Sequence, residues 1–339
     1  MYNKAIINIK PLGFLWETSD PFLFCAHHQD SYPAGNADMG PVESLAGRAI
    51  GQDFDPENAW RMYHGSTVPG FPAHPHRGFE TVTIVLNGLI DHSDSNGASG
   101  RYGNGDVQWM TAGSGLQHAE MMPLINENQP NPLELFQVWL NLPARNKFAK
   151  PFYKMLWAED IPIRSERDEQ GKKIEITIIA GQLNDTVALP PAPDSWAADP
   201  DNEVCIWIAK MEPEAQWVLP AASQPVSRTL YFFRGDSLTV AGTKISMNHA
   251  VELLSDEPLQ LQNGEETGWF LILQGKPIDE MVVQYGPFVM NTRAEIQQAM
   301  VDYHRTQFGG WPWPRDDNVH PRNAGRFAKY DDGTEEQRS

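Results

Sequence analysis

The chain has 339 residues, 41% hydrophobic and 21% charged, which is typical of a globular protein with a sizeable core. Its net charge of −18 argues against nucleic acid or an anionic membrane as a direct partner. No stretch approaches the roughly 20 apolar residues of a membrane helix, and the N-terminus lacks a signal-peptide hydrophobic region. With only two distant cysteines, Cys25 and Cys205, a cytoplasmic protein with free thiols is expected.

The predicted elements are mostly strands, because short segments rich in β-branched or aromatic residues alternate with turn residues. The turn at Asn104-Gly105-Asp106 resembles Arg234-Gly235-Asp236 in the second half, which suggests a structural duplication. Many short strands of this kind favour a sandwich or a barrel. The candidate strands are 5–9, 79–86, 106–111, 133–142, 174–180, 203–209, 229–233, 237–240 and 269–273.

Later segments depart from this strand pattern. The proline-rich stretch 189–201 is expected to be a surface insertion or loop. One helix is predicted over 293–304, because Thr292 and Glu295 have capping-box spacing. Ile296, Ala299, Met300 and Tyr303 would form its apolar face. The tail from Gly309 onward is expected to be irregular and frayed at its charged end.

Two short motifs carry the chemistry of the chain. His74 and His76 are two residues apart, and so are His118 and Glu120, so each pair points to one side of an extended strand. If the two strands are neighbours, three imidazoles and one carboxylate converge. Such a set suits a divalent first-row metal, and the absence of nearby cysteine favours an open site over a closed structural zinc site.

Other residues have weaker claims. Glu80 follows His76 by four residues and could ligate, or could order Arg77 or a ligand histidine. His27 and His28 are expected to be structural, and His92, beside two aspartates, to be solvated. Four aromatic residues are first of all core candidates, but any that face the metal would form an aromatic wall suited to a planar substrate. These are Phe79, Trp109, Phe136 and Trp139.

These motifs resemble the pirin family of the cupin superfamily. The matching segments are 74–82 (HPHRGFETV), 105–113 (GDVQWMTAG), 118–121 (HAEM), 275–278 (GKPI) and 285–292 (YGPFVMNT). The resemblance runs with breaks from about residue 20 to about residue 308. The segments 29–70 and 190–200 look longer than in compact family members and could reshape the mouth of the pocket.

The resemblance implies an all-β bicupin, with two stacked antiparallel jelly-roll barrels and a short C-terminal helix. The expected domains are 1–155 with the metal site, 156–290 without metal, and 291–339 as helix and surface tail. The implied ligands are His74, His76, His118 and Glu120, the four residues that the spacing selects. The implied metal is Fe(2+), with manganese, nickel, copper or zinc as alternatives.

Some pirin-like proteins resemble quercetin 2,3-dioxygenases, which cleave a flavonol ring with dioxygen. The implied function is therefore a metal-dependent dioxygenase acting on a flavonol-like aromatic, with Glu120 as ligand and general base. The alternative that the family implies is a redox-responsive, iron-binding co-regulator that docks a partner protein. A third reading keeps the metal only as a structural staple.

Overall fold

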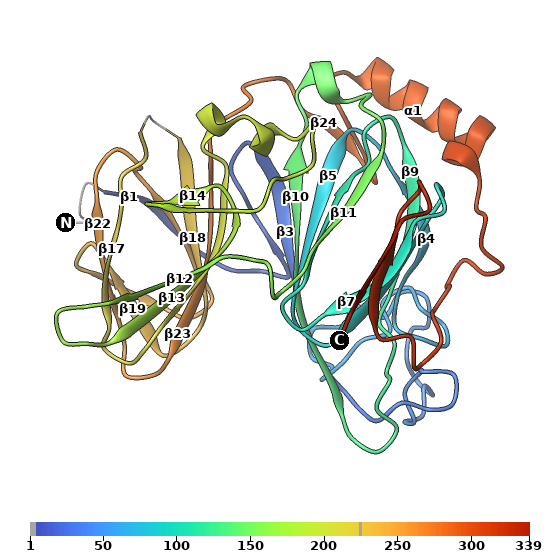
Figure 1. Cartoon of the computed structure of the whole chain (residues 1–339), viewed down its shortest axis with the longest axis horizontal. Coiled ribbons are helices and arrows are strands. Elements are labelled where there is room, and N and C mark those ends of the chain that lie inside the picture. The colour runs from blue at the N-terminus through green and yellow to red at the C-terminus, as the bar shows by residue number, and fades with distance from the viewer. Residues whose placement is uncertain (1–4, 224–225) are drawn as a thin grey trace. The chain divides into compact units, whose positions relative to one another are not determined.

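The computed structural model describes residues 5–223 and 226–339, which separate into two units. Unit 1 comprises Met1–Cys25 and Glu159–Asp279, and unit 2 comprises Ala26–Ala158 and Glu280–Ser339. Strands dominate both, and within the described residues α1 (Arg293–Thr306) is the single α-helix (Figure 1). The predicted all-β class with a short C-terminal helix is confirmed. None of the described helices has the length and hydropathy needed to cross a membrane.

The units draw on both ends of the chain, unlike the predicted ranges 1–155, 156–290 and 291–339. The N-terminal strand β1 (Ile6–Pro11) belongs to unit 1 because it pairs with β21 (His249–Leu253). Near the other end, β26 (Arg326–Lys329) belongs to unit 2 because it pairs with β7 (Ser99–Gly103). As domain boundaries the predicted ranges stay a prediction.

Unit 1 is built from antiparallel sheets around one apolar core. Alternate residues of the two larger sheets, such as Trp207 and Leu230 on one and Trp217 and Leu261 on the other, meet in this core. The larger sheet has the order β1, β21, β18 (Ser227–Arg234), β23 (Gly268–Gly275), β16 (Cys205–Met211), β13 (Lys173–Ala180) and β12 (Ile163–Arg167). The smaller one has the order β17 (Gln216–Leu219), β22 (Leu259–Asn263), β19 (Ser237–Val240) and β20 (Thr243–Ser246). Shorter elements are β2 (Leu15–Trp16), β14 (Gln182–Leu183), β15 (Thr186–Val187), η2 (Trp196–Ala198) and η3 (Pro200–Asn202).

Unit 2 also contains two large antiparallel sheets. One has the order β11 (Phe152–Leu156), β8 (Val107–Thr111), β5 (Phe79–Asn87), β10 (Asn131–Asn141) and β3 (Phe22–Tyr32), the strand in which the chain enters this unit. The other has the order β27 (Glu335–Arg338), β26, β7, β6 (Leu89–Asp94), β9 (Leu116–Met121) and β4 (Gly70–His76). Shorter elements are η1 (Ala144–Asn146), β24 (Val283–Tyr285), β25 (Phe288–Met290) and η4 (Gln307–Gly309).

Gly78 lies where the chain leaves the sheet of β4 and enters that of β5. Its φ of +87° belongs to the left-handed region, and an added Cβ would lie 2.0 Å from the carbonyl oxygen of Val289. Only glycine fits this position without strain. The turn also interrupts strand alternation, so the side chain of Glu80 need not point to the side that His76 faces.

The prediction of an irregular, frayed tail is wrong for its last part, which forms β26 and β27. Polar contacts fix the tail to unit 2. The Arg101 guanidinium makes two hydrogen bonds to Asp91, at 2.6 and 2.8 Å, and also donates to the carbonyl oxygen of His320 at 3.0 Å. Arg326 donates to Asp106 at 2.8 Å. Charged residues that look solvated in sequence are here the partners of buried charges.

The predicted helix is confirmed, with one correction to its apolar face. The Thr292 hydroxyl accepts a hydrogen bond from the backbone N–H of Glu295 at 3.2 Å, as an N-cap residue should. Ile296 and Ala299 are buried, but Met300 is 44% exposed. The apolar face is therefore narrower than predicted, because Ile296 and Ala299 belong to the small cluster formed with Phe288 and Met300 does not.

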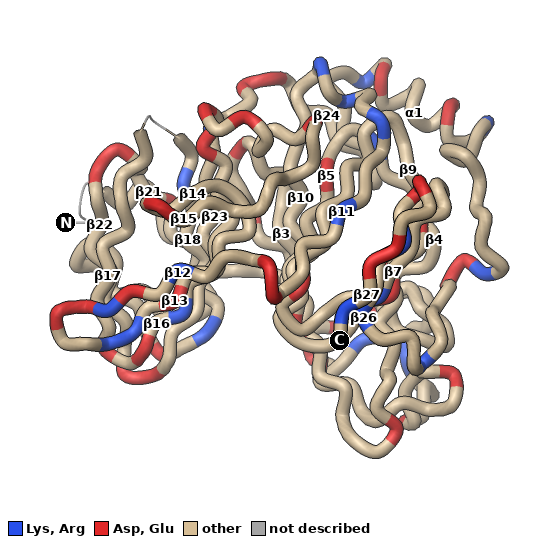
Figure 2. The backbone as a smooth tube through the Cα atoms, in the orientation of Figure 1, with Lys and Arg blue, Asp and Glu red and all other residues tan. Residues whose placement is uncertain are grey.

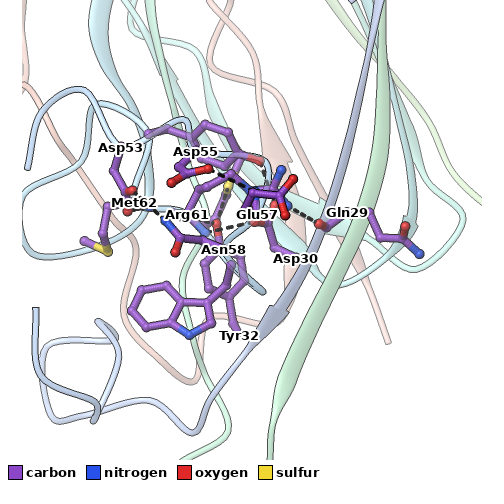
Figure 3. A network of polar contacts seen from close by, with 12 residues as sticks. Gln29, Asp30, Tyr32, Asp53, Asp55, Glu57, Asn58, Arg61 and Met62 are labelled. Atoms are coloured by element: carbon purple, nitrogen blue, oxygen red, sulfur yellow. Dashed lines mark hydrogen bonds and ion pairs between the residues drawn. The ribbon is translucent and has the colours of Figure 1, made fainter. Parts of the chain in front are cut away.

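The long segment between β3 and β4 is held on unit 2 by buried charges (Figure 3). Arg61 Nε donates to Asp30 Oδ1 at 2.9 Å, and the Tyr63 hydroxyl donates to Asp30 Oδ2 at 2.7 Å. Asp53 accepts from the backbone N–H of Met62 at 2.9 Å. These bonds satisfy carboxylates that would otherwise be buried at high cost, and they order a segment with few strands of its own.

Charge is distributed over both units. Asp and Glu outnumber Lys and Arg by 44 to 26, and Figure 2 shows acidic residues in loops of each unit.

Candidate metal centre

The predicted histidines lie on two neighbouring strands of one sheet. β4 pairs antiparallel with β9, and His74 is opposite His118. The register shifts between Phe71 and His74, and irregularities of this kind commonly re-aim side chains beside a functional site. The small residues before His118 allow close backbone approach, since a Cβ on Gly113 would lie 2.2 Å from the carbonyl oxygen of Ala149.

The three imidazoles converge on one point. Ligand atoms of His74, His76 and His118 all lie within 4.8 Å of one another. Nitrogens that share an ion at about 2.0–2.1 Å lie closer together than this limit, so the rings would move toward one another when an ion binds. The nearest carboxylate is that of Glu120, whose Oε2 lies 3.6 Å from His118 Nε2. The structure therefore brings the three predicted histidines together and places Glu120 beside His118. The role of all four as ligands stays a prediction.

The polar contacts of the rings leave nitrogens available for an ion. His74 Nδ1 lies 2.8 Å from the carbonyl oxygen of Pro72, so this nitrogen carries the proton and Nε2 is free to coordinate. Within the described residues, neither ring nitrogen of His118 has a hydrogen-bond partner, and Nδ1 of His76 has none either. Orphaned buried nitrogens that face each other are what a metal would satisfy.

Burial sets the protonation state of the three histidines. It lowers the pKa of His74 to about 4 against the opposing effect of the Pro72 carbonyl. Burial also holds the pKa of His76 and of His118 well below the usual value, and the neighbouring histidines lower them further. All three are neutral at pH 7, the form that coordinates metals. The donor set therefore fits a divalent transition metal.

Glu120 is held by two hydrogen-bond donors that the sequence does not single out. Thr83 Oγ1 donates to its Oε1 at 3.1 Å, and Gln137 Nε2 donates to its Oε2 at 2.7 Å. Trp139 Nε1 in turn donates to Gln137 Oε1 at 3.0 Å. Burial raises the pKa of Glu120, while His92, Gln137 and Thr83 act in the opposite direction. Thr83 and Gln137 are opposite each other on β5 and β10, and only this register brings them together.

Glu80 lies on β5 and not on the sheet that carries the histidines. Its side chain is fully buried, and its Oε1 accepts a hydrogen bond from Thr111 Oγ1 at 2.7 Å. It is not part of the cluster of His74, His76 and His118. Its ordering of Arg77 or a ligand histidine stays a prediction.

Aromatic rings line one side of the cluster. Trp139 packs edge-on against His76 with ring centroids 5.2 Å apart, and Phe79 stacks on Trp139 at 3.9 Å. Phe136 instead stacks on His27 at 4.5 Å, and Trp109 is fully buried. Of the four aromatic candidates, Phe79 and Trp139 therefore form the wall beside the ligands.

A second aromatic group comes from the segment that Figure 3 shows to be anchored by Asp30 and Arg61. Tyr63 stacks on Phe71 with centroids 5.1 Å apart, and Phe71 lies 6.3 Å from the His74 ring. His28 is buried edge-on to Tyr63 at 4.9 Å. The long segment thus reaches the surroundings of His74 through the stacking of Tyr63 on Phe71.

The prediction of a solvated His92 is wrong, because this side chain is fully buried. Its ring stacks on Tyr153 at 4.8 Å and lies 5.7 Å from the His118 ring. His320 Nε2 lies 3.1 Å from the carbonyl oxygen of His92. The tail therefore covers a strand that the neighbouring aspartates make look exposed.

Comparison with family models gives two matches. Residues 15–140 match the model described as Pirin, and residues 206–309 match the Pirin C-terminal cupin domain. The first segment contains the three histidines and Glu120.

Comparison with individual proteins gives relatives of the same kind. The chain is 40% identical to a provisionally named quercetin 2,3-dioxygenase of Pseudomonas aeruginosa, over 70% of this chain and 79% of that protein. It is 34% identical to human pirin, over 79% of this chain and 88% of pirin. The crystal structure of quercetin 2,3-dioxygenase from Acinetobacter baumannii matches with a TM-score of 0.70 and 27% identity, covering 90% of this chain and 98% of that one.

Proposed function

This chain belongs to the pirin family, and from that premise we propose that it is a metal-dependent dioxygenase of the quercetin 2,3-dioxygenase type. Its substrates would be a flavonol-like aromatic and dioxygen. The names of the relatives from Pseudomonas aeruginosa and Acinetobacter baumannii support the reaction class. We propose Fe(2+) as the metal, with manganese, nickel, copper or zinc as alternatives that would suit the same donors.

The observation that carries the proposal is the convergence of three neutral imidazoles, of which His76 and His118 are buried and His74 is partly buried, beside one carboxylate. Ligand atoms of His74, His76 and His118 lie within 4.8 Å of one another, and Glu120 is 3.6 Å from the last of them. Four protein ligands leave up to two positions of an octahedral ion for other groups. A bound divalent ion would supply the positive charge that makes a substrate hydroxyl acidic.

The residues of the chain have separate tasks in this proposal. Glu120 accepts the proton of the substrate hydroxyl, a role helped by a pKa that burial raises. Thr83 and Gln137 keep its carboxylate in place through their hydrogen bonds. Trp139 and Phe79 offer flat apolar faces against which a planar aromatic substrate can stack.

The test compares three variants loaded with iron under anaerobic conditions: His118→Ala, Glu120→Gln and, as control, His304→Ala. His304 is an exposed histidine of α1. Metal content is measured first, and oxygen uptake with quercetin follows on admission of air. We expect His118→Ala to lose both metal and oxygen uptake, and His304→Ala to keep both.

Glu120→Gln separates ligation from proton transfer, because the amide keeps an oxygen donor but cannot act as the base. We expect it to slow turnover by about 10²-fold or more. Full turnover by a metal-free His118→Ala protein would contradict the proposal. Stoichiometric iron without oxygen uptake by the unaltered protein would also contradict it. That result would favour the alternative role, a redox-responsive co-regulator that docks a partner protein.

A further inference from the structure

Unit 1 contains a cavity of about 650 Å³ that the proposed dioxygenase activity does not use. Small-molecule sites typically have volumes of about 300–1,000 Å³. One part of its wall is the proline-rich segment, including Leu189, Pro190 and Pro191, and another is the buried Trp207. The surface insertion predicted from the sequence thus encloses space and does not merely extend a loop.

Two polar residues, Arg228 and Gln274, lie between the apolar core and this cavity. On β18, Leu230 and Phe232 point into the core, and Arg228 comes two residues before Leu230 in the strand. On β23, Ile272 points into the core, and Gln274 comes two residues after it in the strand. Because alternate residues of a strand share a face, Arg228 and Gln274 face the space between the sheets. Both line the cavity.

Arg228 is buried without a full set of partners. It is 3% exposed, and its Nε donates to Gln274 Oε1 at 2.7 Å. No acceptor for its Nη1 is found within residues 5–223 and 226–339. Burial lowers its pKa, and Cys205 and Glu203 offset this effect only in part. Arginine is almost never buried in this way unless it is paired.

Gln274 is oriented by its own contacts toward the same cavity. Its Nε2 donates to the carbonyl oxygen of Glu203 at 3.3 Å and lies 3.5 Å from Cys205 Sγ. The Gln274 carbonyl group is therefore fixed as the acceptor for Arg228. A smaller cavity of about 390 Å³ also borders Arg228, but Gln274 and Cys205 do not line it.

Charges on the wall limit what the cavity can take. The carboxylates of Glu203 and Asp199 line it together with the single guanidinium. Glu203 accepts a hydrogen bond from the backbone N–H of Ser223 at 3.1 Å. One positive charge can neutralise one negative charge, and a dianion would also meet two carboxylates.

We propose that this cavity is a binding site for a small monocarboxylate with an apolar body, whose carboxylate pairs with the Arg228 guanidinium while the body lies against Trp207 and the proline-rich segment. Arginine is suited to this role because its N–H groups match the two oxygens of a carboxylate. The pairing would provide the acceptor that Nη1 lacks in the described residues.

The experiment is calorimetric titration of the metal-loaded full chain with octanoate, 1-octanol and octyl phosphate. We expect octanoate to bind, and we expect the affinities of 1-octanol and octyl phosphate to be lower by about tenfold or more. Arg228→Met should weaken octanoate binding by about tenfold or more, and Arg228→Lys should weaken it by less. In His118→Ala, octanoate affinity should be unchanged, because that residue lies in unit 2.

Equal affinity for octanoate and 1-octanol would overturn the proposal, and so would unchanged octanoate binding by a folded Arg228→Met. Loss of octanoate binding in His118→Ala would place the ligand at the metal and overturn it as well. Tighter binding of octyl phosphate would show an anion site of a different class. If Arg228→Met does not fold, the comparison of octanoate with 1-octanol on the unaltered protein decides alone.

Discussion

A carboxylate beside three imidazoles is useful only if it is held still. Glu120 is buried and receives hydrogen bonds from Thr83 and Gln137, and Trp139 fixes the Gln137 amide. This chain of donors decides which oxygen faces His118. Such outer contacts commonly matter for metal affinity and activity nearly as much as the ligands do.

Gln137→Leu tests this point. Leucine keeps the volume of the side chain but removes the donor to Glu120, so we expect a loss of about 10–100-fold in iron affinity or in quercetin turnover. For iron affinity, Trp139→Phe is the matched control, because it keeps the Gln137 amide and removes the hydrogen bond that anchors it, and its loss of affinity should be smaller. Metal titration and oxygen uptake measure both effects. Unchanged affinity and turnover in Gln137→Leu would show that the hydrogen bond has no role.

At the scale of elements, the last strands close the sheet of the metal centre. Arg101 is 1% exposed, compensates the fully buried Asp91 and also binds the carbonyl oxygen of His320 in the tail. Arg326 joins β26 to Asp106, which also accepts from two backbone N–H groups, those of Gly103 and Ala158. The two arginines therefore differ in what their removal leaves behind.

We expect Arg101→Met to lower the free energy of unfolding by about 3–5 kcal/mol, because Asp91 loses both hydrogen bonds from the guanidinium and keeps one backbone donor, the N–H of His320. Arg326→Met should cost clearly less, since Asp106 keeps its two backbone donors. Urea unfolding measures both losses, and limited proteolysis should cut the tail faster in Arg101→Met. Equal losses in the two variants would show that the backbone donors of Asp106 do not compensate for the loss of its arginine.

The elements also show what the sequence can and cannot predict. Runs of β-branched and aromatic residues between turn residues predicted strands such as β5 and β10. The i, i+2 spacing selected three histidines that converge in the structure and Glu120, which lies beside one of them. Thr83 and Gln137 were missed because a polar residue in a strand carries no signal until the register is known. Strand β26 was missed because its partner β7 lies far away in the chain.

At the scale of the whole molecule, buried histidines should make the protein sensitive to mild acid. Burial lowers the pKa of His28 to about 3, so the folded protein keeps it neutral while the unfolded chain binds a proton below about pH 6.5. Stability from this residue is therefore complete above pH 6.5 and falls as the pH decreases. The loss is about 1.4 kcal/mol per pH unit for each such proton.

We expect the free energy of unfolding of the metal-free protein to fall between about pH 6.5 and about pH 5.5. His28→Leu should reduce the slope of this decrease by the contribution of about one proton, which is about 1.4 kcal/mol per pH unit. His304→Ala, which changes an exposed histidine, should leave the slope as it is. Glu120 opposes the trend because its raised pKa favours the folded state in acid. Urea titrations at a series of pH values measure the slopes. An identical slope in His28→Leu would contradict the assignment.

The pairing of β7 with β26 also has a consequence for synthesis. Residues 99–103 leave the ribosome long before residues 326–329, and at 5–20 residues per second the interval is roughly 10–45 s. Through that interval β7 offers the nascent chain an unpaired strand edge, which is a template for association with other chains. Unit 2, which carries the candidate metal centre, is therefore exposed to aggregation during translation, and it should depend on chaperones until its last strands arrive.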